Sequence, residues 1–95
     1  MNPFRTNDEL FAFVEELREF LASTGDVELT DQLTRTNRFI SGPPSEYLHE
    51  VYLALKQVLL FPPQALSGER EDEISSVMRQ IDDTFRTTND SHGKT

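Results

Sequence analysis

The 95-residue chain contains no cysteine, and its four glycines stand apart from one another. Without cysteine, the chain can form no disulfide bond, no thiolate metal site and no cysteine nucleophile. Because the glycines are isolated, there is no glycine-rich loop that could cradle a phosphate group. No serine lies within the G-x-S-x-G motif of a hydrolase. The sequence therefore predicts no catalytic residue and no cofactor.

Long hydrophobic runs are also missing, because none approaches the ~20 residues that a membrane-spanning helix requires. The N-terminal residues lack the basic stretch and apolar core of a secretory signal. Small secreted domains commonly depend on disulfide bonds, which this chain cannot form. We therefore expect a cytoplasmic protein that does not enter a membrane.

Basic residues are few: nine lysines and arginines stand against 17 aspartates and glutamates, for a net charge of -8. Nucleic-acid binding draws much of its affinity from basic side chains at phosphates, and anionic membrane surfaces attract basic segments. The charge therefore argues against both nucleic acid and membrane as partners. It is compatible with a basic protein partner, although the same charge also serves solubility alone.

Hydrophobic residues recur with the period of an α-helix in four segments, and no segment alternates convincingly as a β-strand does. Short connections between these segments favour antiparallel neighbours. The sequence thus predicts an all-α fold, a small antiparallel four-helix bundle in one domain over residues 1–87, with a disordered C-terminal tail over residues 88–95. The predicted helices cover about residues 7–22, 26–39, 44–61 and 69–86.

Local signals mark the helix ends. Thr6 and Glu9 have the spacing of a capping box at the start of the first helix. Gly25 supplies the left-handed residue that commonly follows a helix, and Asp26 is a favourable N-cap for the second helix. Leu66, in the linker before the fourth helix, is expected to pack onto the core.

The third helical segment, residues 47–61, is the most apolar part of the chain. A surface helix needs only one apolar stripe, whereas this segment is apolar on most of its circumference. Such a helix is normally surrounded by other helices or by a partner chain. We therefore expect the third helix to lie at the centre of the bundle.

Several large apolar residues exceed what one small core can hold. Leu53 and Leu60 lie well off the stripe of the third helix, Phe61 lies at its edge, and Phe11 flanks the stripe of the first helix. We predict that these four residues form an interface, with Phe4 as a further member. The alternative is that the N-terminal arm folds back, so that Phe4 and Leu66 cover the excess.

Glu46, His49 and Glu50 lie on one side of the third helix and could in principle meet a divalent metal ion. The second histidine of an H-E-x-x-H zinc site is missing. A polar strip that faces water is the simpler interpretation, and we predict no metal ligand. A metal site or metal-dependent enzyme at these residues is only a minor alternative.

A domain of this size buries only about 60–65% of its unfolded surface, so its stability margin is thin. A partner or a second copy would add buried area. With no catalytic motif and an over-apolar third helix, the sequence favours a small, acidic, non-enzymatic protein-interaction module of the adaptor, regulatory or inhibitor type. The main alternative is a structural module that forms a homodimer through the third helix.

Overall fold

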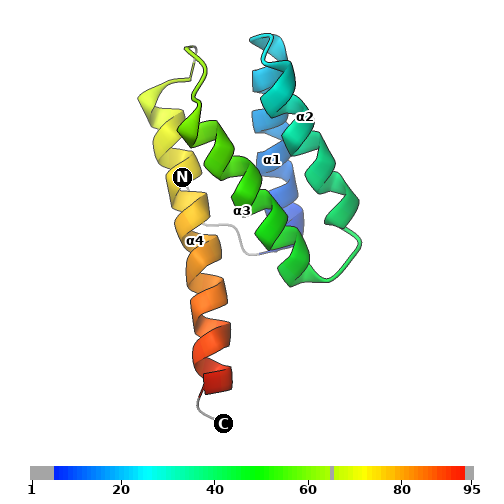
Figure 1. Ribbon diagram of the computed structural model, residues 1–95, viewed down its shortest axis with the longest axis vertical. Coiled ribbons are helices and arrows are strands. Elements are labelled where there is room, and N and C mark those ends of the chain that lie inside the picture. The colour runs from blue at the N-terminus through cyan, green and yellow to red at the C-terminus, as the bar shows by residue number, and fades with distance from the viewer. Residues whose placement is uncertain (1–5, 65, 94–95) are drawn as a thin grey trace.

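Figure 1 shows the computed structural model of the protein, which describes residues 6–64 and 66–93. Four α-helices run alternately up and down, and the described residues contain no β-strand. The predicted all-α, antiparallel arrangement is confirmed. The elements in chain order are α1 (Asn7–Ser23), α2 (Val27–Thr36), the 3-10 helix η1 (Asn37–Phe39), α3 (Pro44–Leu60) and α4 (Gly68–Gly93).

Both α1 and α2 begin where their capping residues predicted, and α1 ends just before Gly25, as predicted. Thr6 Oγ1 accepts a hydrogen bond from the backbone N–H of Glu9 over 3.2 Å. Asp26 Oδ1 accepts one from the backbone N–H of Leu29 over 3.1 Å. Between the two helices, Gly25 has a φ of 83°, a left-handed conformation that glycine adopts without strain. The hydrogen bonds accepted by Thr6 and Asp26 each satisfy a backbone N–H group that the first turn of a helix leaves without a partner.

α2 ends earlier than predicted, and its last turn tightens into η1. The predicted helix over residues 26–39 is thus divided between two elements. Thr36 is buried at the junction, where its hydroxyl donates a hydrogen bond to the carbonyl of Leu33 over 2.7 Å. Because its hydroxyl is hydrogen-bonded, the polar side chain of Thr36 can occupy a buried position on the side of α2 that faces the core.

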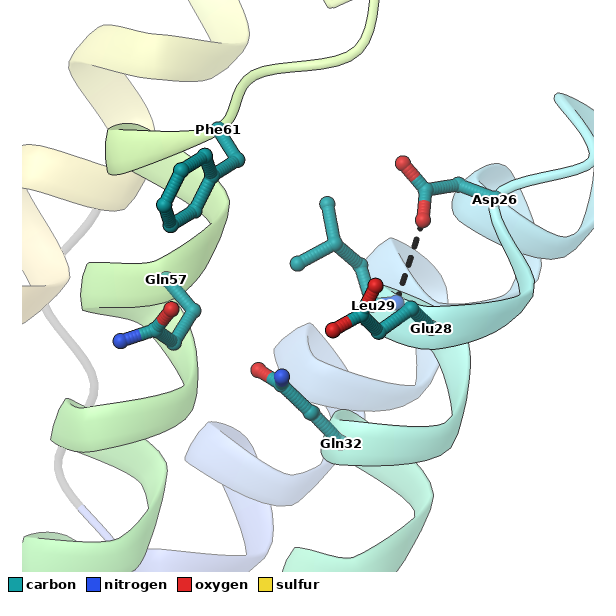
Figure 2. Close-up of a pocket in the computed structure, with 6 residues that line it drawn as sticks. All are labelled: Asp26, Glu28, Leu29, Gln32, Gln57 and Phe61. Atoms are coloured by element: carbon teal, nitrogen blue, oxygen red, sulfur yellow. Dashed lines mark hydrogen bonds between the residues drawn. The ribbon is translucent and has the colours of Figure 1, made fainter.

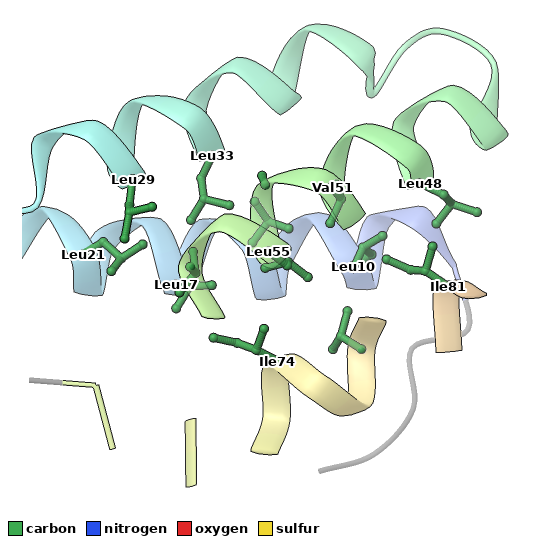
Figure 3. Packing of buried hydrophobic residues seen from close by; sticks show 14 of the residues in the cluster. Leu10, Leu17, Leu21, Leu29, Leu33, Leu48, Val51, Leu55, Ile74 and Ile81 are labelled. Atoms are coloured by element: carbon green, nitrogen blue, oxygen red, sulfur yellow. The ribbon is translucent and has the colours of Figure 1, made fainter. Parts of the chain in front are cut away.

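α3 occupies the centre of the fold, as predicted. It packs against both α2 and α4 and also meets α1, which lies behind it in Figure 1. Tyr47, Val51, Leu55 and Val58 of α3 are completely buried. Figure 3 shows Val51 and Leu55 between the apolar side chains of the other helices. The other buried apolar side chains are those of Leu10, Val14, Leu17, Leu21, Leu29, Leu33, Leu48, Ala54, Leu66, Ile74, Val77 and Ile81.

The C-terminal end of α4 lies beyond its predicted position. The prediction ended this helix at residue 86, whereas the helical backbone continues to Gly93. The predicted disorder of residues 88–95 stays a prediction, and residues 94 and 95 lie outside the described residues. Once a helix has formed, each further residue adds one backbone hydrogen bond at little extra cost. No proline interrupts the segment after Arg86. The end of α4 therefore extends past the other three helices in Figure 1.

Candidate partner-binding face

Two large apolar side chains in the C-terminal half of α3, and a third just after its end, face away from the core. Leu53, Leu60 and Phe61 are 43%, 57% and 67% exposed, and together they define what we call the outer α3 face. Leu53 and Leu60 are two helical turns apart, about 10 Å along the helix axis. Both were predicted to lie off the buried stripe. The same helix therefore supplies the centre of the core on one side and an apolar surface on the other.

Phe11, the fourth residue of the predicted interface, does not belong to this surface. It lies on α1 and packs, partly buried, against the core. Its position beside Leu10 allows it to cover the edge of the core, and its place in an interface stays a prediction. Phe4 lies outside the described residues.

A groove separates the outer α3 face from α2. It has a volume of about 250 Å³ and is lined by Asp26, Glu28, Leu29, Gln32, Gln57 and Phe61. In Figure 2, Glu28 and Gln32 extend from α2 toward α3, and Phe61 stands on the opposite wall. Gln32 Oε1 is buried and has no hydrogen-bond partner among the described residues. We call this space the α2–α3 groove.

A second groove lies on the other side of α3, between α3 and α4. Its volume is about 210 Å³, and its lining comprises His49, Tyr52, Leu53, Asp82 and Phe85. The rings of His49 and Phe85 meet edge to face, with centroids 6.5 Å apart. We call it the α3–α4 groove. Leu53 and Phe61 thus border one groove each, and the outer α3 face lies between the two.

The two grooves differ in how their carboxylates are paired. Asp82 of the α3–α4 groove accepts a hydrogen bond from Arg86 over 2.9 Å, in an ion pair one turn along α4. Asp26 and Glu28 of the α2–α3 groove take part in none of the ion pairs found within residues 6–64 and 66–93. The α2–α3 groove therefore carries uncompensated negative charge.

The polar strip of α3 does not gather into a metal site. Glu46 and His49 are exposed, and Glu50 is half-buried. Nowhere in the part of the chain that the structure describes do three or more histidine, aspartate or glutamate side chains lie close enough to hold a metal ion. The geometry therefore gives no support to the alternative that these residues form a metal-dependent site.

A polar cluster joins α1 to η1. Glu15 accepts hydrogen bonds from Arg18 over 2.7 Å and from Asn37 over 3.1 Å. The hydrogen bond from Arg18 is the main cause that lowers the pKa of Glu15. Tyr47 is fully buried with no partner for its hydroxyl among the described residues, and burial raises its pKa to about 12, with a smaller contribution from Glu15.

Sequence reasoning missed most of the groove residues. Glu28, Gln32 and Gln57 are polar residues on helix flanks, and each by itself resembles an ordinary solvated side chain. Only the packing of α2 beside α3 makes them walls of one groove. The available signal was the apolar excess of α3, and it identified Leu60 and Phe61 but not the residues facing them.

No protein-family model, no curated protein and no solved structure matches this chain. Among the described residues, no helix combines the length and the apolar character needed to cross a membrane. The function must therefore be inferred from the surface chemistry of the chain itself.

Proposed function

We propose that the protein is a small, non-enzymatic interaction module that binds a partner protein through the outer α3 face. The exposure of Leu53, Leu60 and Phe61 on one side of the central helix carries this proposal. Apolar surface rimmed by polar residues is typical of protein-binding sites. The carboxylates in the flanking grooves and the net charge of -8 favour a basic partner. The cytoplasm is the proposed compartment.

Self-association through the same face is the second candidate, since an apolar surface can also pair with its own copy about a two-fold axis. Charge disfavours it, because two copies would bring acidic rims together. Light scattering after size exclusion, at low and at high salt, distinguishes the two. We expect a monomer at both salt concentrations, whereas a dimer that persists at both would favour the homodimer.

Site-directed photocrosslinking in the cells that produce the protein tests which face meets a partner. The photoreactive residue replaces Lys56, an exposed residue of α3 that lies between Leu53 and Leu60. The matched control places it at Glu16, an exposed position on α1. Neither position contributes to the core, so both variants should fold.

The proposal predicts one discrete crosslinked species from position 56 and none from position 16. The added mass identifies the occupant, and a mass equal to a second copy of the chain would establish self-association instead. Equal crosslinking from both positions, or none from position 56, contradicts a binding role for the outer α3 face. Replacing both Leu53 and Leu60 with glutamine should abolish the species without changing the net charge.

A further inference from the structure

The α2–α3 groove has an excess of hydrogen-bond acceptors and of negative charge. Asp26 and Glu28 supply two carboxylates that form no ion pair within the described residues. Gln32 Oε1 adds a buried acceptor that no described group satisfies. An unsatisfied acceptor is costly when it is kept away from water. The groove is therefore complementary to a group that brings several donors and a positive charge.

The aromatic side chain that lines the groove favours one kind of cationic group over another. Phe61 is 67% exposed and lies on the α3 side of the groove, opposite the wall formed by α2 (Figure 2). A guanidinium group stacks on aromatic rings and carries five donors in one plane, whereas an ammonium group is a compact and strongly hydrated charge. The same molecule contains such a stack, because the guanidinium carbon of Arg70 lies 4.5 Å from the centre of the Phe20 ring.

The size of the groove points to a side chain rather than to a small molecule. Sites for drug-sized ligands and cofactors commonly measure about 300–1,000 Å³, and this groove measures about 250 Å³. It is also continuous with the outer α3 face, because Phe61 belongs to both. A group in the groove would therefore be carried by whatever covers Leu53 and Leu60.

We propose that the α2–α3 groove receives an arginine side chain of a helical partner segment whose apolar face covers the outer α3 face. This inference rests on the proposed function and names the chemistry of the partner. The guanidinium donates to Glu28 and stacks on Phe61, and a rotation of the Gln32 side chain brings its buried Oε1 to accept from the same group. Apolar residues of the segment pack on Leu53 and Leu60. The α3–α4 groove is not the arginine site, because Arg86 already pairs with its carboxylate.

The test uses a displayed library of amphipathic helical peptides. Two leucines are fixed two turns apart to match the outer α3 face, and the flanking positions are randomised. Peptides are selected on the wild-type protein and counter-selected on the Leu53→Gln, Leu60→Gln double variant, which has the same net charge. We expect arginine to be enriched, above lysine, at one edge of the selected helices.

Affinities of the best arginine peptide for single variants then test the contacts. Glu28→Gln should weaken binding about tenfold, which corresponds to about 1.4 kcal/mol, and Phe61→Leu should weaken it about threefold to tenfold because the ring is lost while an apolar side chain remains. Glu16→Gln on α1 makes the same change of net charge away from the groove and should alter the affinity less than twofold. Circular dichroism establishes that each variant retains its helices.

The outcomes separate this inference from the proposed function. Peptides that require Leu53 and Leu60 but show no arginine enrichment, or that bind Glu28→Gln as tightly as wild type, overturn the arginine site and leave the binding face intact. An equal loss of affinity in Glu28→Gln and Glu16→Gln also overturns it, because only overall charge would then matter. If no peptide prefers the wild type to the double variant, both the face and the arginine site are refuted.

Discussion

Replacing Tyr47 with phenylalanine should make the protein more stable, although Tyr47 is among the most deeply buried residues. Its hydroxyl is enclosed in the core and has no partner among the described residues. A buried, unsatisfied polar group costs about 1–3 kcal/mol. The substitution removes that cost and keeps the ring, at the expense of a small void. We expect a gain of about 1 kcal/mol at neutral pH, which raises the melting temperature by about 4–8 °C in a domain of this size.

The same residue should make the wild-type protein sensitive to alkali. The pKa of Tyr47 is about 12 in the folded protein, compared with 10.0 for an unperturbed tyrosine. Between these values the unfolded chain loses its proton first, so the folded state binds more protons and stability falls as pH rises. The contribution of the protonated Tyr47 side chain to stability is fully present below pH 10 and is lost between pH 10 and pH 12. At about 1.4 kcal/mol per pKa unit, the loss is about 3 kcal/mol.

Urea unfolding of three proteins from neutral pH to pH 12 measures both effects. The stability advantage of Tyr47→Phe over the wild type should be about 1 kcal/mol at neutral pH and should grow by about 3 kcal/mol toward pH 12. Tyr52→Phe is the matched control, because it removes the other tyrosine hydroxyl, from a half-buried position. Because this variant retains Tyr47, its stability should still fall between neutral pH and pH 12. A Tyr47→Phe variant that is less stable at neutral pH, or whose advantage stays constant with pH, refutes this reasoning.

Three further predictions concern separate parts of the fold. Replacing Leu53 and Leu60 with glutamine should change the free energy of unfolding by less than about 0.5 kcal/mol per site, whereas Leu55→Ala in the core should cost about 2–5 kcal/mol; equal losses in urea titrations would place Leu53 and Leu60 in the core. Asp26→Ala should cost about 0.5–2 kcal/mol through the lost N-cap, and Asp26→Ser should restore most of it; no loss in the alanine variant would argue against the cap. The pKa of Glu15 is lowered in the folded state, so its carboxylate stabilises the protein above its unfolded pKa, and this contribution is lost on acidification. The Glu15→Gln variant should therefore lose less stability than the wild type as pH falls. Equal losses of stability in the two proteins on acidification would contradict this.

The helices could be predicted from the sequence because their signals are local. Thr6, Gly25 and Asp26 act within one turn of their own positions, and the apolar period needs no knowledge of the neighbouring helix. The end of α4 at Gly93 could not be predicted in this way. It depends on the low free-energy cost of extending an existing helix, and neither apolar periodicity nor capping residues report that cost.

Side chains whose environment depends on another element were harder to place. Glu15 is one such residue, because Arg18 and Asn37 cover it and leave it half-buried. Asn37 comes from η1, a long way along the chain. The unpartnered hydroxyl of Tyr47 is a second case, because its burial depends on the helices packed around α3. Exposure of Leu53 and Leu60 followed from the helical period, but the grooves beside them arise from packing between helices.

α3 carries its buried and its exposed apolar side chains at separate positions. Its buried residues, such as Val51 and Leu55, hold three other helices together, and Leu53 and Leu60 contribute little to that core. A small domain with a thin stability margin gains from burying every large apolar side chain. Side chains of this size left exposed on the most central helix are therefore better explained by a binding role than by folding. Because the exposed residues and the buried ones alternate along one rigid helix, a partner on the outer α3 face would meet a surface already held in place, and little conformational entropy would be lost on binding.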